Sequence, residues 1–193
     1  MNIVTIDTGT TNTRVCLWQD QNFVDSEKRP VGVRNTSIDG DNHQIMEGIS
    51  EAFFELLSRN RLTERDIFRV LASGMITSKL GLVEIPHAVA PVDINTLAGQ
   101  MHQQQFEQIC GQPIWFITGV KNFEKTTADN WEAMDIMRGE EVEVFAVLQQ
   151  MKDPGPMLVV LPGSHTKFVA ISGAGEISGS CTTLAGELNA VVT

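Results

Sequence analysis

The chain has 193 residues, of which 42% are hydrophobic and 20% are charged, a composition typical of a globular protein with one large domain or with one domain and part of another. Its 24 acidic residues outnumber its 14 basic ones, and the formal charge of −10 argues against a nucleic-acid partner, because such binders concentrate basic charge. No apolar run approaches the roughly 18 residues of a membrane-spanning helix, and the segment MNIVTID lacks a signal-peptide pattern, so we expect no membrane partner.

The three cysteines, Cys16, Cys110 and Cys181, are far apart in the sequence and lack the spacing of a metal site. An odd number of widely separated cysteines is typical of reduced thiols. The sequence therefore predicts a cytoplasmic location.

In chain order, the first half of the sequence predicts strands, one helix and one more strand. The predicted ranges are strands over 2–6 and 13–18 with a third opening at 23, a helix from 45, and a buried strand over 68–72. Because few residues separate the first two strands, the segment DTGTTN is predicted to connect them as a hairpin.

The second half predicts further elements and one linker. The predicted ranges are a glutamine-rich surface helix over 95–110, a strand over 113–120, a helical region over 130–151, and three strands after 157 separated by PGS and SGAG turns. Gly139 interrupts the helical region and is expected to end one helix and begin another. The segment KDPGP, 152–156, is the strongest linker signal, and LAGEL is typical of a helix start.

The turn DTGTTNTR carries the first functional signal. Gly9 lets the backbone approach a ligand closely, and Thr10, Thr11 and Asn12 add donors, so the turn is suited to phosphate. A carboxylate does not bind phosphate directly, and Asp7 is therefore predicted to act on the metal side, through water, with Mg²⁺ between them. The alternative is a hairpin turn in which Asp7 accepts hydrogen bonds from nearby N–H groups.

A second polar turn, LPGSHTK, follows the linker. Gly163, Ser164, Thr166 and Lys167 are candidates for a second phosphate contact, in which the lysine supplies a compact positive charge. The turn is not a Walker A loop, because a strand rather than a helix follows it. The alternative is a hairpin turn with an exposed lysine, and His165 alone is more typical of a structural histidine.

The segment GAGEISG, 173–179, resembles a dinucleotide-binding fingerprint, but its glycine spacing is one residue too long. A strand rather than a helix follows it, and we therefore predict a hairpin turn.

The segment DIMRGEE offers candidate catalytic carboxylates. Asp135, Glu140 and Glu141 surround Gly139, and Arg138 is a candidate for binding an anionic substrate. A hydroxyl nucleophile needs a carboxylate within hydrogen-bonding reach to accept its proton. The alternative is that acidic residues in a first helical turn complement the helix dipole. Glu141 interrupts the apolar stripe of the predicted helix, which makes it a candidate in its own right.

The segment GMITSKLG follows a predicted buried strand, and ligands of open α/β folds gather at such strand ends. Its candidate substrate-binding residues are Gly74, Met75, Ser78 and Lys79. An ordinary surface loop is the alternative.

Together these motifs resemble one family. IDTGTTNTR, GMITSKLGLVEIP, DIMRGEE, LPGSHTKFV and TLAGEL occur in the order found in 2-dehydro-3-deoxygalactonate kinases, which belong to the sugar kinase, actin and Hsp70 superfamily. The resemblance implies an α/β fold of actin-like, ribonuclease H-like domains with mixed sheets and an active site in the cleft between two such domains. It also implies ATP and Mg²⁺ as cofactors and phosphorylation of the 6-hydroxyl of 2-dehydro-3-deoxy-D-galactonate in galactonate breakdown.

The resemblance implies roles and boundaries as well. The first hairpin turn and LPGSHTK would be the two phosphate motifs. The position after Gly139 favours Glu140 as catalytic base, with Asp135 as rival, whereas the apolar stripe points to Glu141. The expected domains are 1–151 and 152–193, the second incomplete relative to a normal domain size.

Three functions remain open on the sequence alone. They are the sugar-acid kinase, a non-catalytic sugar-acid-binding or regulatory remnant, and a sugar kinase with a different substrate. An incomplete second domain would also expose strand edges, so a homo-oligomer is possible.

Overall fold

The computed structural model of the chain describes residues 1–153 and 155–192. The described chain forms two compact units, the first of residues 1–85 and 101–118, and the second of residues 86–100 and 119–193. Pro154 of the predicted linker lies outside the described residues. The predicted division at residue 151 stays a prediction; by packing, residues 86–100 and 119–151 belong with the C-terminal strands.

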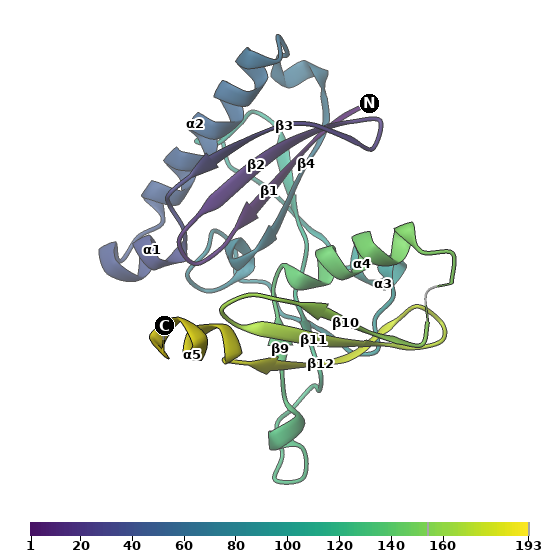
Figure 1. Cartoon of the computed structure of the whole chain (residues 1–193). Coiled ribbons are helices and arrows are strands. Elements are labelled where there is room, and N and C mark those ends of the chain that lie inside the picture. The colour runs from purple at the N-terminus through teal and green to yellow at the C-terminus, as the bar shows by residue number, and fades with distance from the viewer. Residues whose placement is uncertain (154, 193) are drawn as a thin grey trace. The chain divides into compact units, whose positions relative to one another are not determined.

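Unit 1 is built on a six-stranded mixed sheet with the order β3-β2-β1-β4-β7-β6. Figure 1 shows β1, β2, β3 and β4 of this sheet. The strands are β1 (Asn2–Thr8), β2 (Thr13–Gln19), β3 (Asn22–Arg29), β4 (Ile67–Gly74), β6 (His102–Gln105) and β7 (Pro113–Phe116). The pairs β1–β2, β2–β3 and β6–β7 are antiparallel, whereas β1–β4 and β4–β7 are parallel. The sheet is therefore mixed, as predicted.

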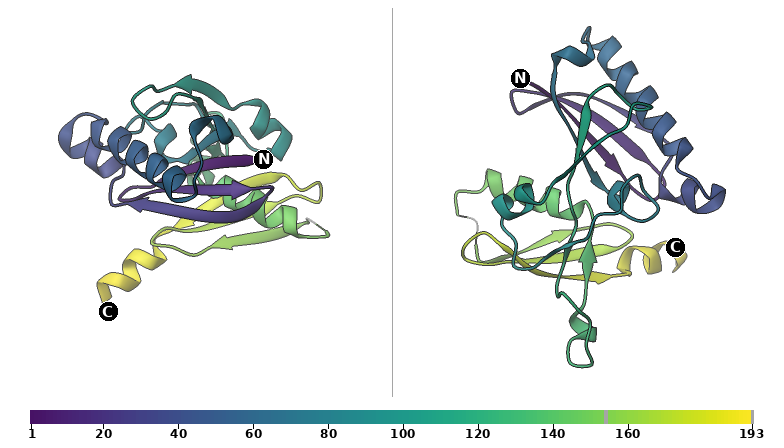
Figure 2. Two further views of the ribbon diagram at one scale, coloured as in Figure 1. Left: turned by 90° about the horizontal axis from the view of Figure 1, so that it is seen from above. Right: turned by 180° about the vertical axis from the view of Figure 1, so that it is seen from behind.

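Helix α2 (His43–Arg59) packs on β2 and β3, and the short helix α1 (Val33–Asp39) precedes it (Figures 1 and 2). The buried positions of α2 recur at helical spacing: Ile45, Gly48, Ile49, Ala52, Phe53, Leu56 and Leu57. A Cβ atom at Gly48 would lie 2.6 Å from Cγ1 of Val31, so glycine permits the close approach of α2 to the segment between β3 and α1. This stripe and the inward side chains of β1, β2, β4 and β7 form the core of unit 1.

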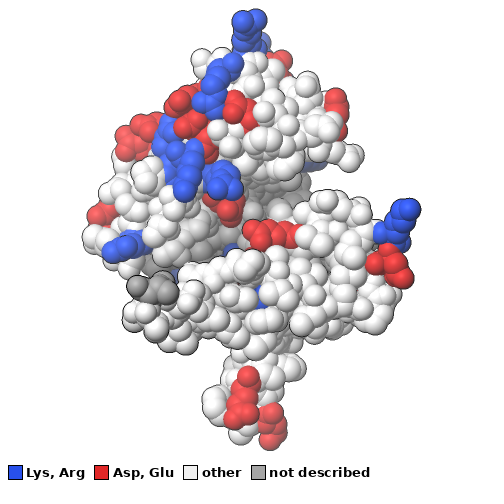
Figure 3. All heavy atoms as spheres, in the orientation of Figure 1, with Lys and Arg blue, Asp and Glu red and all other residues white. Residues whose placement is uncertain are grey.

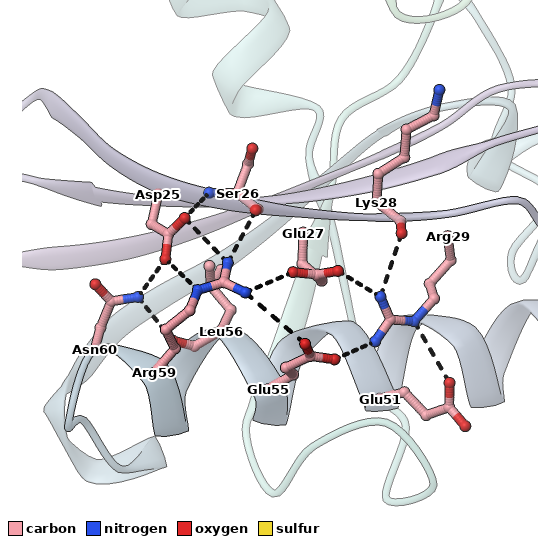
Figure 4. Close-up of polar contacts among 10 residues, drawn as sticks. All are labelled: Asp25, Ser26, Glu27, Lys28, Arg29, Glu51, Glu55, Leu56, Arg59 and Asn60. Carbon is pink, nitrogen blue, oxygen red and sulfur yellow. Dashed lines mark hydrogen bonds and ion pairs between the residues drawn. The ribbon is translucent and has the colours of Figure 1, made fainter.

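An ion-pair network joins β3 to α2 at the edge of the sheet (Figure 4). Arg59 donates to Asp25 through Nε at 2.8 Å and to Glu27 through Nη1 at 2.8 Å. Arg29 donates to Glu27 at 2.7 Å and to Glu55 at 2.6 Å. Basic and acidic side chains are therefore interleaved over β3 and α2 rather than segregated into a basic patch (Figure 3).

Unit 2 holds two small sheets, with the orders β10-β11-β12 and β5-β8-β9. The strands are β5 (Ala88–Val89), β8 (Val120–Lys121), β9 (Ile136–Met137), β10 (Met157–Leu161), β11 (Thr166–Ile171) and β12 (Ile177–Thr183); the helices are α3 (Ile94–Gly99), α4 (Glu140–Gln150) and α5 (Ala185–Val192). The described residues also form short 3-10 helices at Glu64–Asp66 and Met75–Thr77 in unit 1 and at Trp131–Ala133 in unit 2. An antiparallel bridge between Val92 and Ile177 connects the segment before α3 to β12.

The structure confirms both predicted hairpins, the three strands after 157 and the helix at LAGEL, and GAGEISG lies at the turn between β11 and β12. The helix predicted over 95–110 is wrong beyond Gly99, because His102–Gln105 pairs as an antiparallel edge strand with β7. The helix predicted before Gly139 is also wrong, because Ile136–Met137 pairs with β8. Glutamine favours helices, but this propensity is weak, and the tertiary pairing of 102–105 with β7 overrides it.

Within residues 1–153 and 155–192, every helix falls short of the length and apolar character needed to cross a membrane.

Candidate functional site

The first candidate site is the turn between β1 and β2 in unit 1. The backbone N–H of Gly9 donates to the carbonyl oxygen of Asn12 at 2.8 Å, and the Asn12 amide donates to the Thr11 hydroxyl at 2.9 Å. Thr10 and Thr11 are exposed, and their backbone N–H groups donate none of the hydrogen bonds found among the described residues. The turn therefore offers outward-facing N–H donors, as an anion-binding concavity requires.

The start of α1 holds this turn in place through hydrogen bonds to its backbone. The N–H groups of Val33 and Arg34 donate to the carbonyl oxygens of Gly9 at 3.2 Å and Thr10 at 2.9 Å. A Cβ atom at Gly32 would lie 2.5 Å from the Gly9 oxygen, so only glycine fits here without a shift of backbone. The helix start engages the carbonyl oxygens of the turn and leaves the N–H groups of Thr10 and Thr11 available.

The end of β4 lies beside Asp7. In the parallel register Asp7 faces Ser73 and Thr8 faces Gly74. Gly74 has a positive φ of +83°, and a Cβ atom there would lie 2.7 Å from the Thr8 carbonyl oxygen and 2.8 Å from Oδ1 of Asp7. Glycine at this position therefore lets the GMITSKLG loop begin directly against the predicted metal-side carboxylate.

Within that loop, Ser78 uses its hydroxyl locally. Its Oγ donates to the Met75 carbonyl oxygen at 2.7 Å, and its backbone N–H donates to the same oxygen at 3.0 Å. Lys79 is exposed, and its ammonium has no ion pair among the described residues. The Lys79 ammonium is therefore exposed to solvent and available to an anionic ligand.

The second turn, between β10 and β11 in unit 2, is also backed by a helix start. The N–H of Glu187 in α5 donates to the Ser164 carbonyl oxygen at 3.1 Å, and a Cβ atom at Gly186 would lie 2.8 Å from Cα of Ser164. The Thr166 hydroxyl donates to the Gly163 carbonyl oxygen at 3.3 Å. Gly163 and Ser164 thus lie in an exposed turn, and Thr166, which is half-buried, begins β11 beside them.

Lys167, predicted to offer its charge at this turn, is 4% exposed. Its ammonium donates to the Ile136 carbonyl oxygen at 2.7 Å, contacts Oδ2 of Asp135 at 3.3 Å, and also donates to the Thr182 hydroxyl. A lysine ammonium has three donors, and these contacts occupy all of them. Phosphate binding by Lys167 stays a prediction that requires one of these contacts to open.

Asp135, the rival candidate for the catalytic base, is engaged by the same cluster. Besides Lys167, the Ser180 hydroxyl donates to Oδ2 at 2.6 Å and the Thr182 hydroxyl donates to Oδ1 at 2.8 Å. Both carboxylate oxygens therefore have protein partners, and the cluster connects β9 to β11 and β12.

The two glutamates at the start of α4 bend back onto the preceding backbone. Oε2 of Glu140 accepts the Arg138 N–H at 2.9 Å, and the carboxylate of Glu141 accepts the Gly139 N–H at 2.8 and 3.0 Å. Glu141 is fully buried, and burial raises the pKa of its carboxyl to about 7. The side chain that interrupts the apolar stripe therefore faces the core, whereas Glu140 is only partly buried.

His87 was not singled out by any sequence motif, yet it lies against the predicted substrate residue Arg138. The Nη2 atom of Arg138 is 3.4 Å from Nδ1 of His87. Burial, and then the positive charges of Arg138 and Lys121, lower the pKa of His87 to about 4. The segment EIPH follows the GMITSKLG loop after two residues, and no motif of the sequence marked this histidine.

The residues are compatible with Mg²⁺ held mainly by phosphates and water. Among the described residues, no group of three or more His, Cys, Asp or Glu side chains is placed to hold a metal ion. Mg²⁺ at phosphate sites typically takes one or two carboxylates together with phosphate oxygens and waters. Asp7, exposed at the end of β1 beside the open turn, fits that single-carboxylate arrangement.

Comparison with solved structures defines the class of fold. A protein from Sinorhizobium meliloti assigned as a 2-dehydro-3-deoxygalactonokinase matches with a TM-score of 0.73 and 19% identity, over 98% of this chain and 56% of that chain. The type II variant of the Aquifex aeolicus Ppx/GppA phosphatase matches with a TM-score of 0.52 and 14% identity, over 98% of this chain and 54% of that chain. The fold is therefore a mixed α/β fold of the actin-like ATPase type.

The chain belongs to the 2-keto-3-deoxy-galactonokinase family, whose model matches residues 7–193. The 2-dehydro-3-deoxygalactonokinase of Escherichia coli (strain K12) is 25% identical over 186 residues, which are 96% of this chain and 54% of that protein. The family resemblance seen in the motifs is confirmed. The chain spans about half the length of the curated relative that it matches.

Proposed function

We propose that this chain takes part in ATP-dependent phosphorylation of the 6-hydroxyl of 2-dehydro-3-deoxy-D-galactonate, a cytoplasmic step of galactonate breakdown. The observation that carries the proposal is the β1–β2 turn, whose Thr10 and Thr11 N–H groups are open beside the exposed carboxylate of Asp7. Membership of the 2-keto-3-deoxy-galactonokinase family supplies the substrate class.

In this proposal the first turn binds phosphate oxygens. The N–H groups and hydroxyls of Thr10 and Thr11 would donate to the nucleotide, Gly9 and Asn12 would hold the shape of the turn, and Asp7 would orient water on Mg²⁺. The bound ion would neutralise charge that develops on the transferred phosphoryl group. Gly163, Ser164 and Thr166 of the second turn are proposed as a further phosphate contact.

Glu140 is the proposed catalytic base. Both oxygens of Asp135 are engaged by Lys167 and by hydroxyl groups, and Glu141 is fully buried. Glu140 is only partly buried, and one backbone N–H holds its Oε2 in place. Its carboxylate is therefore the one of the three best suited to accept a proton from the substrate hydroxyl.

Two cationic side chains are proposed to bind the sugar acid. Lys79 and Arg138, with Gly74, Met75 and Ser78 shaping the loop, are proposed to bind the sugar acid, whose carboxylate needs positive partners. A homo-oligomer is compatible with this assignment but is not required by it.

Mg²⁺-dependent formation of ADP, measured with 2-dehydro-3-deoxy-D-galactonate as acceptor, tests the proposal. Glu140→Gln is expected to lower kcat by about 10²–10⁴-fold, the usual range for a general base. The decrease in kcat is smaller if the transition state of phosphoryl transfer is loose, because little proton removal is then needed. Glu143→Gln, an exposed change on the same helix, is the matched control. Full activity of Glu140→Gln would contradict the role of Glu140, and a preference for another acceptor in a panel of sugars and sugar acids would contradict the substrate.

A second candidate is a sugar-acid-binding chain without catalysis. It is favoured by one observation, that all donors of Lys167 are engaged inside unit 2. Isothermal titration calorimetry distinguishes the two: binding of the sugar acid without binding of Mg·ATP would support this candidate, and binding of both would support the kinase.

A further inference from the structure

His87 and Arg138, both half-buried, meet beside the β5-β8-β9 sheet of unit 2. The two segments that carry them flank β8, since Ala88 pairs with Val120 on one side and Met137 pairs with Val120 on the other. These pairings place the His87 imidazole and the Arg138 guanidinium next to each other by backbone geometry. The 3.4 Å approach of Nη2 to Nδ1 is therefore fixed by a sheet rather than by two mobile side chains.

Gly119 leaves room for this pair. A Cβ atom at Gly119 would lie 2.7 Å from Cγ of Arg138 and 2.8 Å from Cδ2 of His87, and it would also meet the Met137 carbonyl oxygen. The imidazole and the alkyl part of the arginine therefore occupy the space that any other residue at 119 would fill. This packing gives the imidazole little freedom to turn.

The imidazole has one nitrogen without a partner. A guanidinium only donates hydrogen bonds, so Nδ1 of His87 must be the acceptor, and the proton of the neutral ring lies on Nε2. Nε2 is buried and has no hydrogen-bond partner within residues 1–153 and 155–192. A buried N–H without an acceptor is costly, and in native proteins it calls for an explanation such as a missing ligand.

We propose that His87 is a substrate-binding residue, whose Nε2–H donates to a carboxylate oxygen of the sugar acid while Arg138 supplies the opposite charge. This inference rests on the proposed function, because it takes a sugar acid as the ligand. The chemistry matches: the acceptor is anionic, the donor is a neutral N–H beside a cation, and the unpaired donor gains its acceptor only when the ligand is bound.

Three variants of the full chain separate binding by His87 from support of Arg138. In His87→Asn the carbonyl oxygen can replace Nδ1 as acceptor for Arg138, but the donor at Nε2 is lost. In His87→Gln the longer side chain places an amide N–H near the position of Nε2. His87→Phe keeps an aromatic ring and removes both nitrogens.

Affinity for 2-dehydro-3-deoxy-D-galactonate, measured by isothermal titration calorimetry, is expected to fall about 10- to 100-fold in His87→Asn and His87→Phe. His87→Gln should recover most of the loss, and affinity for Mg·ATP should change less than about 2-fold in all three, since a nucleotide contact is not invoked. Circular dichroism verifies the fold of each variant.

The outcomes are distinct. Equal affinity of His87→Asn and wild type, with wild type binding the sugar acid, would overturn the role of His87 and leave the proposed function standing. No binding of the sugar acid by the wild type would overturn both. Loss of the fold in all three variants would show that the imidazole is structural, and it would overturn the inference as well.

Discussion

The two hairpin regions of the molecule share one order of elements and differ in where they place charge. Each consists of a hairpin, a third antiparallel strand and a helix: β1, β2, β3 and α1 in unit 1, and β10, β11, β12 and α5 in unit 2. Gly32 and Gly186, at the two helix starts, each contact the preceding turn. The first turn leaves its donors open beside the exposed Asp7, whereas Lys167 at the second is buried and fully hydrogen-bonded. A common scaffold thus supports two different polar sites.

The third strands of the two regions also differ in how their edges are protected. Edge strand β3 carries the Asp25 and Glu27 ion pairs to α2 (Figure 4). Edge strand β12 is instead capped by one side chain: the Asn122 amide donates to the Ser180 carbonyl oxygen at 2.8 Å and accepts the Ser180 N–H at 2.8 Å. An amide that pairs like a peptide group blocks strand addition at that point, as charged residues do on β3.

The largest expected effect separates the buried lysine of the second region from the open turn of the first. Lys167→Met would leave Asp135 as a carboxylate with no cation, and removing one partner of a buried ion pair typically costs about 3–5 kcal/mol. Urea denaturation should show this loss in the free energy of unfolding.

The double variant Lys167→Met, Asp135→Asn is the control. It removes the unpaired charge but keeps an acceptor for Thr182, so part of the stability should return. Wild-type stability of Lys167→Met together with weaker Mg·ATP binding would contradict a structural role and favour the phosphate role predicted from the sequence.

The next prediction tests whether the two helix starts are equivalent. Gly32→Ala and Gly186→Ala each place a Cβ atom against backbone atoms of a turn. Because backbone cannot move aside as the end of a flexible side chain can, we expect each variant to lower the free energy of unfolding by about 1–3 kcal/mol. The control is Gly99→Ala, since nothing lies within 4 Å of a Cβ atom at Gly99. Thermal unfolding measures all three. Unequal costs at 32 and 186 would show that one turn adapts and the other does not.

The sequence predicted the hairpins well but did not indicate that Lys167 is buried. Hairpins are local, and Gly, Thr and Ser in a short segment between apolar runs determine them. Lys167 was assigned to the turn, but β11 begins at Thr166, and alternation then places Lys167 on the same buried face as Val169 and Ile171. The alternation could be seen in the sequence. The contact with Asp135 that permits the burial of Lys167 could not, because Asp135 lies 32 residues away.

The other misses have the same cause. The helix predicted over 95–110 failed because pairing with β7 is a long-range contact that local propensity cannot show. Glu141 was noted because it interrupts an apolar stripe, and it is indeed buried, but only the structure shows that its carboxylate accepts the Gly139 N–H. His87 lies outside every motif, and pairing of β5, β8 and β9 brings it to Arg138.

A smaller effect concerns the open turn itself. Asp7→Asn should weaken Mg²⁺-dependent turnover by about 10- to 100-fold, the range for removing a group that orients a metal's ligands without binding the metal directly. Because Asp7 is exposed, the free energy of unfolding should change little. A Mg²⁺ titration of the activity measures the effect. An unchanged Mg²⁺ dependence would contradict the metal-side role and support the alternative of an ordinary hairpin turn.

The smallest expected effect tests the charged edge of β3 against the buried pair of unit 2. Hydrogen bonds from Arg59 and then Asn60 lower the pKa of Asp25 to about 2, below the roughly 3.9 of an unfolded chain. A lowered folded-state pKa means that this carboxylate stabilises the fold above about pH 4 and that the contribution is lost as the pH falls toward 2.

Asp25→Asn should therefore be less stable than wild type at pH 7. The difference should shrink as the pH falls from about 4 toward 2, because the Asp25 carboxylate becomes protonated. The difference at pH 7 should be at most about 1 kcal/mol, because the Asp25 and Arg59 side chains are 28% and 43% exposed and water screens their attraction. Thermal unfolding of both proteins across this pH range, at low and high salt, measures it. Since salt screens exposed charges, the difference should shrink at high salt, whereas the cost of Lys167→Met should not. A salt-insensitive difference at Asp25 would show that the edge of β3 is stabilised as the buried cluster is, and the contrast between the two regions would then not hold.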